Sequence, residues 1–185
     1  MTIEFPGAER NAGWFTIEEV VHIARERTLN QGWHTPMVIA EGSRNSAMVM
    51  LEDFPQTHEE KVFQMFTTGA ILAKSDEVGE LYQVFFVCEG WMSTAGKNKP
   101  IIRRPSHDPD RKEVLLISHS RIKERRNGMV IFEMVRDVEG RLADLKEFQL
   151  AAEGEGGRVE SPLLDAFVAG FRLGKGAKKS DKPIR

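Results

Sequence analysis

Four carboxylate side chains stand at positions where a small enzyme could use them. Glu41 and Glu89 lie near the ends of predicted strands, and Asp108 and Asp110 lie in a proline-containing loop. A carboxyl group can act as a general acid or base when burial or a neighbour moves its pKa toward the working pH. Glu89 stands two residues before Trp91, whose apolar ring could raise the pKa of that carboxyl group. These four groups are candidate catalytic residues of a hydrolase, provided that the fold brings them to one pocket.

The loop that contains the two aspartates is the most distinctive segment of the chain. It reads Arg-Arg-Pro-Ser-His-Asp-Pro-Asp-Arg-Lys-Glu from position 103 to position 113. Its prolines stiffen the backbone, and its serine and aspartates favour tight turns, so turn formation alone could explain this composition. Surface loops also carry many binding residues. The candidate residues of a ligand- or partner-binding loop are therefore Trp91, Arg103, Arg104, His107, Arg111, Lys112 and Glu113.

The same loop lacks the ligand pattern of a metal site. His107, Asp108 and Asp110 crowd within four positions, and no His-x-x-x-His or Cys-x-x-Cys pair elsewhere could complete a coordination shell. The chain also lacks a Walker-type phosphate loop, a dinucleotide-binding fingerprint and a Gly-x-Ser-x-Gly nucleophile elbow. We therefore predict neither a bound metal nor a cofactor.

Trp91, the run from Pro105 to Glu113 and the strand predicted to follow it resemble an uncharacterised family of prokaryotic proteins. The pattern that carries the resemblance is Pro-Ser-x-Asp-Pro-x-Arg-Lys-Glu after an upstream tryptophan. The resemblance implies no activity, so the functional interpretation depends on the residues themselves.

Two basic stretches could attract nucleic acid or an acidic protein. One is the charged turn 121–126, and the other is the C-terminal tail from Lys175 onward. Unpatterned charge usually keeps a turn or tail in solvent, and no aromatic residues alternate with it for base stacking. The formal net charge of −2 also argues against nucleic acid as the main partner. The candidate basic patch consists of Arg121, Lys123, Arg125, Arg126, Lys178 and Lys179.

Length and composition indicate one ordinary folded domain. The chain has 185 residues, of which 41% are hydrophobic and 29% charged. Its one cysteine, Cys88, lies in an apolar run and is expected to be a small buried residue of a strand. The N-terminus does not resemble a signal peptide, and no apolar run reaches the ~18 residues of a membrane span. We expect a cytoplasmic protein without a membrane partner.

Three helices are marked by their capping residues. Thr16 and Glu19 have the spacing of a capping box, as do Thr57 and Glu60. Gly32 is a natural end for the first helix, and the second should end near residues 74–76. The last helix is expected to begin with Ser161 as cap and to end at Gly174. The expected buried face of the second helix comprises Val62, Phe63, Phe66, Ala70 and Leu72.

The strand pattern predicts an α+β fold with a single, mainly antiparallel sheet. Strands are expected at residues 36–41, 46–52, 81–91, 113–119, 129–137 and 142–150. The predicted order is α-β-β-α-β-β-β-β-α, with five to six strands in the sheet and the helices packed on it. This order is similar to that of profilin-like and roadblock domains. We expect a flexible lead-in at 1–13, one domain at 14–174 and a disordered basic tail at 175–185.

These features favour a non-catalytic binding or adaptor domain, with a protein partner or self-association as a homodimer. A hydrolase that uses the strand-end and loop carboxylates is the first alternative. A nucleic-acid-associated regulator that uses the basic turn and tail is the second. A deep pocket that joins the carboxylates would favour the enzyme, whereas an exposed apolar patch would favour the adaptor.

Overall fold

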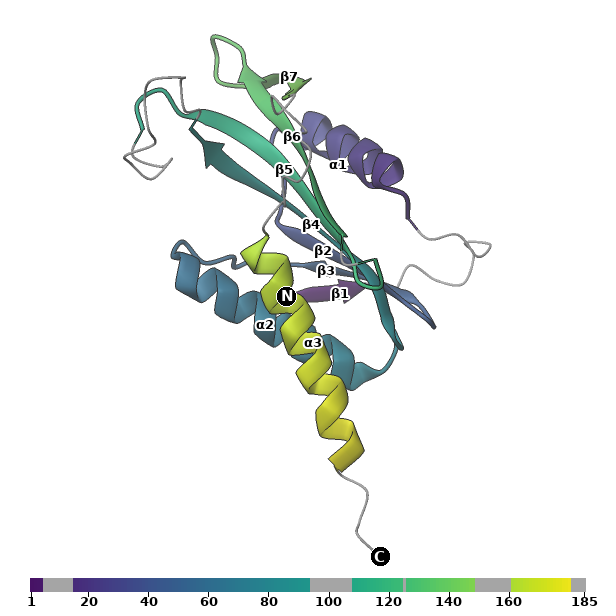
Figure 1. Ribbon diagram of the computed structural model, residues 1–185. Helices are drawn as coiled ribbons and strands as arrows, with labels where there is room; N and C mark the ends of the chain where they lie inside the picture. The colour runs from purple at the N-terminus through teal and green to yellow at the C-terminus, as the bar shows by residue number, and fades with distance from the viewer. Residues whose placement is uncertain (5–14, 94–107, 125, 149–160, 181–185) are drawn as a thin grey trace, which may run out of the picture.

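The computed structural model describes residues 1–4, 15–93, 108–124, 126–148 and 161–180. These residues form one seven-stranded antiparallel sheet and three helices, which confirms the predicted α+β class (Figure 1). The strand order in the sheet is β1-β3-β2-β4-β5-β6-β7. The strands are β1 (Thr2–Glu4), β2 (Met37–Gly42), β3 (Ser46–Met50), β4 (Leu81–Met92), β5 (Lys112–Arg121), β6 (Arg126–Arg136) and β7 (Leu142–Glu147). The helices are α1 (Ile17–Gln31), α2 (His58–Ser75) and α3 (Pro162–Ser180).

The helix ends follow from the predicted caps. Before α1, the Thr16 hydroxyl accepts the N–H of Glu19 at 3.2 Å, and the Glu19 carboxylate accepts the N–H of Thr16 at 2.8 Å. The helix ends at Gly32, which has a φ of 76° that favours glycine. The Thr57 hydroxyl accepts the N–H of Glu60 at 3.3 Å at the start of α2. Local sequence therefore fixes where both helices begin.

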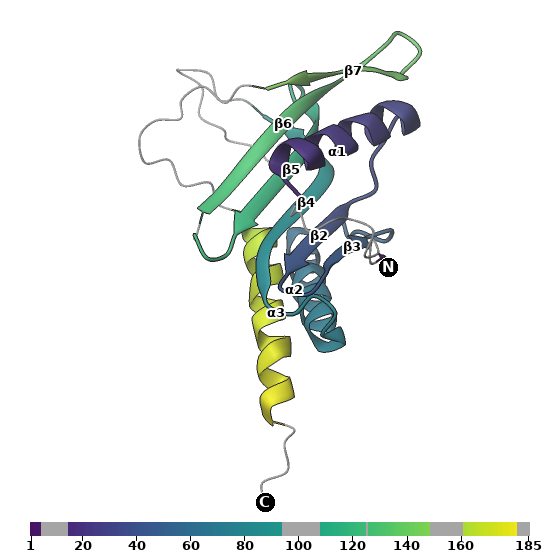
Figure 2. The same ribbon diagram turned by 90° about the vertical axis from the view of Figure 1, so that its right-hand side faces the viewer.

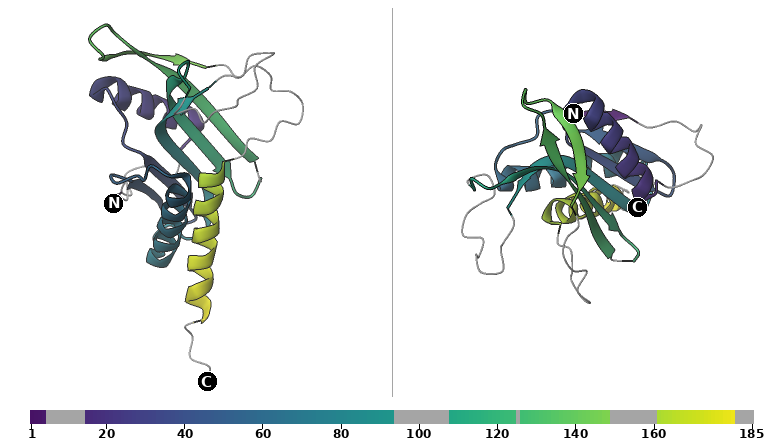
Figure 3. Two further views of the ribbon diagram at one scale, coloured as in Figure 1. Left: turned by 90° about the vertical axis from the view of Figure 1, so that its left-hand side faces the viewer. Right: turned by 90° about the horizontal axis from the view of Figure 1, so that it is seen from above.

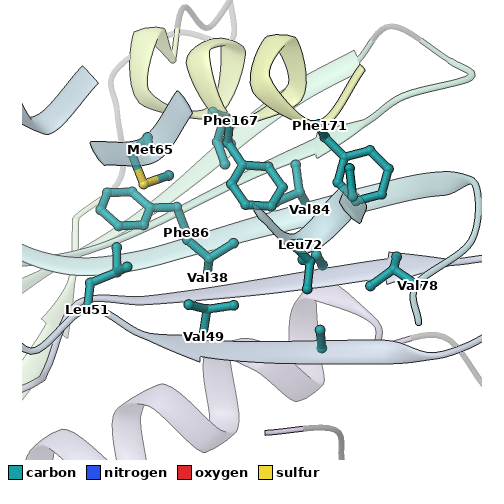
Figure 4. Packing of buried hydrophobic residues seen from close by; sticks show 14 residues of the cluster. Val38, Val49, Leu51, Met65, Leu72, Val78, Val84, Phe86, Phe167 and Phe171 are labelled. Atoms are coloured by element: carbon teal, nitrogen blue, oxygen red, sulfur yellow. The ribbon is translucent and has the colours of Figure 1, made fainter. Parts of the chain in front are cut away.

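Helix α1 covers one face of the sheet, and helices α2 and α3 cover the opposite face, as two perpendicular views show (Figures 1 and 2). Strand residues alternate between the two faces, so Val38 and Ala40 contribute to one core cluster while Met37 and Ile39 contribute to the other. Under α2 and α3, Phe167 and Phe171 pack toward Val84, Phe86 and Val38 (Figure 4). The second cluster contains Val20 and Ala24 of α1 together with sheet residues such as Phe85, Leu115 and Phe132. Cys88 of β4 packs against the first cluster, and burial raises the pKa of its thiol to about 12.

Helices α2 and α3 pack closely because glycines line their contact. A Cβ atom at Gly170 would clash with the carbonyl oxygen of Phe66, and one at Gly69 would clash with that of Phe167. Glycine permits this approach because it lacks a Cβ atom. The two helices therefore pack against each other as one layer on their face of the sheet.

The expectation of a flexible lead-in was wrong for its first residues. Residues Thr2–Glu4 form β1, which pairs antiparallel with β3. In this register Thr2 lies opposite Met50, Ile3 opposite Val49 and Glu4 opposite Met48. Ile3 packs against the first core cluster. Three residues are too few for an alternating pattern to predict a strand. This strand also explains why the sheet has seven strands instead of five to six; the rest of the lead-in, residues 5–14, lies outside the described residues.

The predicted end of the last helix at Gly174 was also wrong. Helix α3 continues to Ser180, and its final turns project beyond the sheet (Figure 3). Gly174 faces α2, where a Cβ atom would lie 2.6 Å from the carbonyl oxygen of Ala70, and the next residue, Lys175, pairs with Asp76. Glycine here permits helix contact instead of ending the helix. The expected disordered tail thus begins with helical residues, and residues 181–185 lie outside the described part of the chain.

The expected buried face of α2 requires a correction as well. The helix buries Met65, Thr68, Gly69, Leu72 and Ala73, whereas the side chain of Phe63 is 70% exposed. Apolar residues occur on both sides of α2, so hydrophobic periodicity alone does not show which side meets the sheet.

None of the described helices combines the length and the apolar composition that crossing a bilayer requires.

Candidate functional site

A groove of about 630 Å³ lies between α1 and the strands β6 and β7. Its apolar lining comes from Ile17, Val21 and Leu29 of α1 and from Val130 and Phe132 of β6. Phe132 is buried at the floor, while Leu29 stays partly exposed to solvent. We call this cavity the α1 groove.

The rim of the α1 groove is mainly acidic. Glu18 and Glu26 of α1 and Glu147 of β7 are exposed carboxylates in its lining. The two basic side chains of the lining already have partners: the Arg25 guanidinium lies 4.9 Å from the centre of the Phe132 ring, and His22 lies 3.5 Å from the Glu26 carboxylate. The groove therefore combines an apolar floor with acidic edges.

A buried carboxylate holds the start of α1 on the sheet. Glu41 is fully buried, and its carboxylate accepts the N–H of Phe15 at 2.7 Å, one residue before the helix cap Thr16. The side chains of Gln83 on β4 and Ser46 on β3 also donate to it. Both are the direct strand partners of Glu41. This candidate catalytic residue thus lies in an interior hydrogen-bond network that positions one wall of the α1 groove.

Two half-exposed tryptophans lie near Glu89 at the other end of β4. The Glu89 carboxylate accepts the N–H of His34, the residue after Trp33, and Trp91 lies two positions further along the same face of the strand. Glu113 is the strand partner of Trp91, and its carboxylate accepts two hydrogen bonds from Arg136, each of 2.6 Å. We call Trp33, Glu89, Trp91, Glu113 and Arg136 the tryptophan cluster.

Glu89 is the group of this cluster that is best suited to proton transfer. Burial raises the pKa of its carboxyl group, the hydrogen bond from His34 opposes that shift, and the charge on Glu113 adds to it. The neighbouring Glu113 carboxylate is already paired with Arg136.

The four candidate catalytic carboxylates do not form one group. Glu41 pairs with Gln83, and Glu89 lies six residues further along β4, which corresponds to about 20 Å. Asp108 accepts the N–H of Asp110 at 2.9 Å in a tight turn, the structural role that its sequence context also allowed. A hydrolase site that needs Glu41 and Glu89 together is therefore not supported by this geometry.

Part of the predicted binding loop does lie at the tryptophan cluster. The Arg111 guanidinium lies 4.5 Å from the centre of the Trp91 ring, and its nitrogen contacts the carbonyl oxygen of Asp108 at 3.4 Å. Lys112 pairs with Glu133 at 2.7 Å. Trp91, Arg111, Lys112 and Glu113 are thus brought to neighbouring ends of β4 and β5. Arg103, Arg104 and His107 lie outside the described residues.

The described residues of the candidate basic patch are divided between the β5–β6 turn and the end of α3. Arg121 and Arg126 are strand partners, and Arg121 lies 3.5 Å from Glu124. The Lys123 ammonium lies 4.5 Å from the centre of the Tyr82 ring. Arg125 lies outside the described residues, and Lys178 and Lys179 belong to the last turns of α3. Whether this surface binds nucleic acid stays a prediction.

Sequence reasoning missed the α1 groove. One signal was present, since α1 carries Ile17, Val21 and Leu29 on a side adjacent to its buried residues Val20, Ala24 and Thr28. When the apolar side of a helix is wider than the stripe that packs on the core, the extra apolar residues indicate a second contact surface. The other wall comes from strands more than 100 positions away in the sequence, which helical periodicity cannot locate.

In the described part of the chain, no group of three or more His, Cys, Asp or Glu side chains is arranged to hold a metal ion.

Comparisons with protein-family models, with curated proteins and with solved structures give no match to this chain. The resemblances to a prokaryotic family and to profilin-like and roadblock domains stay predictions.

Proposed function

We propose that this protein is a non-catalytic binding domain that docks a basic, amphipathic segment of a partner protein in the α1 groove. The observation that carries the proposal is the combination of an apolar floor and an acidic rim in one cavity of about 630 Å³. Concave, mainly apolar surfaces with a few polar groups at their edges are the usual form of binding sites.

The dimensions of the groove suit a short peptide segment. Its lining on α1 extends from Ile17 to Leu29, which corresponds to about 18 Å along the helix axis. A helical segment of about twelve residues has that length, and an extended segment of about six residues spans a similar distance. Either could place apolar side chains against Val21, Leu29 and Val130, which are at least partly exposed in the groove lining.

The charges of the groove favour a basic partner. Glu18, Glu26 and Glu147 stand exposed at the rim, with Glu26 beside His22, while Arg25 is held over the Phe132 ring. Lysines or arginines of a bound segment would therefore meet carboxylates on both walls. Such complementarity selects partners and accelerates association, and added salt weakens it.

The same features argue for binding instead of catalysis. A catalytic acid or base is usually held in a partly desolvated position that shifts its pKa. The carboxylates of the groove stand at its exposed rim, and Glu89 lies in the tryptophan cluster, not in the groove lining.

A peptide-display experiment tests the proposal without a known partner. A random library of 12-residue peptides is panned against the full chain, and the enriched peptides are synthesised and titrated by calorimetry. We expect peptides in which lysine or arginine alternates with large apolar residues. We expect Leu29→Asn and the double variant Glu18→Lys/Glu26→Lys each to weaken their binding at least 10-fold, because one removes apolar contact and the other reverses the rim charge.

Two matched variants serve as controls. Val138→Asn changes a fully exposed apolar residue in the β6–β7 turn, and Glu77→Lys/Glu80→Lys makes the same change of net charge on another surface. Both should bind the peptides as the unmodified chain does. The proposal fails if the enriched peptides have no basic residues, or if control and groove variants bind them equally.

A further inference from the structure

Helix α2 carries apolar residues on its solvent side as well as on its buried side. From Val62 to Ala73 the helix contains no charged residue. The exposed side nevertheless includes Phe63, which is 70% exposed, and Ile71, which is 43% exposed. A surface helix normally carries charged or polar residues on its outer side, and a helix that is apolar all round is normally buried. The outer side of α2 therefore has the composition of a contact surface.

The exposed apolar residues Phe63 and Ile71 lie on one side of α2, with the partly buried Thr67 between them. Phe63, Thr67 and Ile71 recur every four residues, so they form a slightly slanted stripe on one side of the helix, along about 12 Å of its axis. Glu60 precedes this stripe by one turn, and Lys74 follows it by one turn. We call these five residues the α2 stripe.

The α2 stripe is symmetric about Thr67. Phe63 and Ile71 each stand four residues from Thr67, and Glu60 and Lys74 each stand seven residues from it. Reversing the direction of the helix therefore places apolar positions on apolar positions and an acidic position on a basic one. A surface that matches itself after such a reversal is what a two-fold symmetric contact requires.

We propose that two copies of this chain associate through an antiparallel contact between their α2 helices, with the two Thr67 residues at the symmetry axis. Phe63 of one copy then packs against Ile71 of the second copy, and Glu60 faces Lys74 of the second copy. Leu173 of α3 is also exposed, and it directly precedes Gly174, which contacts α2.

Charge complementarity favours a second copy as the occupant of this surface. The first turn of α2 is acidic through Glu59 and Glu60, and its last turn is basic through Lys74. An antiparallel partner helix of the same sequence brings opposite charges together at both ends, whereas a parallel one brings like charges together. The α1 groove lies on the opposite face of the sheet, so pairing through α2 leaves it open in both copies.

Cysteine cross-linking tests the register of this contact. All variants carry Cys88→Ala, which removes the one native thiol. At usual helix separations of 8–10 Å, facing residues at the axis come within the distance that a disulfide bond spans. Thr67→Cys should therefore form a disulfide-linked dimer by itself. Phe63→Cys should not, because two Phe63 positions lie about 12 Å apart along the paired helices, but a mixture of Phe63→Cys and Ile71→Cys should cross-link.

Sedimentation of the full chain tests the association itself. We expect a dimer at micromolar concentration and about 100-fold weaker association for Phe63→Lys, because a charged residue replaces a central apolar contact in both copies. Val138→Lys makes a similar change at an exposed residue outside α2 and should leave the dimer unchanged. Circular dichroism checks that each variant is folded.

The possible outcomes separate this contact from others. A chain that is monomeric at 100 µM, a dimer that persists in folded Phe63→Lys, or cross-linking of Phe63→Cys with itself overturns the proposal. Peptide binding in the α1 groove is measured on the same variants, and Phe63→Lys should retain it. Loss of dimerisation and failure of the groove proposal are therefore distinguishable.

Discussion

The Glu41 carboxylate accepts the backbone N–H of Phe15 at 2.7 Å, although Glu41 lies on β2 and Phe15 directly precedes Thr16, the cap of α1. The contact joins the buried centre of the sheet to the helix that forms one wall of the α1 groove. Because Glu41 is fully buried, its oxygens depend on protein donors for their hydrogen bonds. This hydrogen bond explains how a carboxylate residue at a strand end can position the start of α1 on the sheet.

Replacing Glu41 by alanine should loosen α1. The change leaves the N–H of Phe15 and the amide of Gln83 without this acceptor, and it removes buried side-chain volume. We expect the free energy of unfolding to fall by roughly 2–4 kcal/mol and the amides of α1 to exchange faster. Urea denaturation and hydrogen exchange measure the two effects. Glu52→Ala removes an exposed carboxylate and should cost less than about 0.5 kcal/mol; equal losses in the two variants would contradict the prediction.

Two glycines of α3 should respond in opposite ways to alanine. A Cβ atom at Gly170 would clash with the backbone of Phe66 in α2, whereas a Cβ atom at Gly176 meets no atom within 4 Å. Gly170→Ala should therefore lower the free energy of unfolding by about 1–3 kcal/mol through overpacking. Gly176→Ala should leave it unchanged or raise it by up to about 1 kcal/mol, because alanine favours helix. Thermal and urea denaturation measure both, and a stable Gly170→Ala variant would argue against close contact of α2 and α3.

The ion pair between Arg136 and Glu113 should contribute more to stability than the ion pairs of Arg141. The Arg136 side chain is 32% exposed and makes two hydrogen bonds of 2.6 Å to Glu113, whereas the Arg141 side chain is 72% exposed. The Glu113 carboxylate also holds the pKa of the Arg136 guanidinium above its ordinary value. We expect Arg136→Ala to cost about 1–3 kcal/mol and Arg141→Ala less than about 0.5 kcal/mol. Urea denaturation that shows the reverse order would contradict this assignment.

The sequence predicted the parts of the fold that depend on neighbouring residues. Thr16 and Glu19 fix the start of α1 through bonds between residues three positions apart, so their types alone reveal the helix start. The antiparallel sheet followed in the same way from short links between apolar runs. Gly174 shows the limit of such reasoning, because its neighbour in space is Ala70 and its role is set by helix packing, not by local preference.

The candidate sites depended on distant contacts and were therefore predicted only in part. Trp91, Arg111 and Glu113 were expected near one another, and the pairing of β4 with β5 does bring them together. The α1 groove needs the register of β6 beneath α1, which no periodicity within either element contains. The exposed position of Phe63 likewise depends on which side of α2 meets the sheet.

His34 should make the stability of the protein depend on pH in the acid range. The residue is only 3% exposed to solvent, and burial lowers the pKa of its imidazole from 6.5 to about 4. A backbone contact with Thr35 opposes this shift, and the positive charge of Arg27 adds to it. Between those two pKa values the unfolded chain binds a proton at this position and the folded chain does not. Stability must therefore fall as the pH decreases from about 6.5 to about 4, and this contribution becomes constant below that range.

The size and the origin of this effect can be measured by comparing variants. Each unit of pKa difference corresponds to about 1.4 kcal/mol, so His34 should account for a loss of up to roughly 3 kcal/mol. Glu89, which contacts the backbone of His34, has a raised pKa and acts in the opposite direction, since its folded form binds the extra proton. Urea denaturation of the unmodified chain and of His34→Gln between pH 7.5 and 4 isolates the contribution of the histidine to the pH dependence of stability. Glu89 contributes equally in both proteins, so its effect cancels in the comparison. His22→Gln changes an exposed histidine and should retain the full pH dependence; if His34→Gln retains it too, His34 is not the group that titrates.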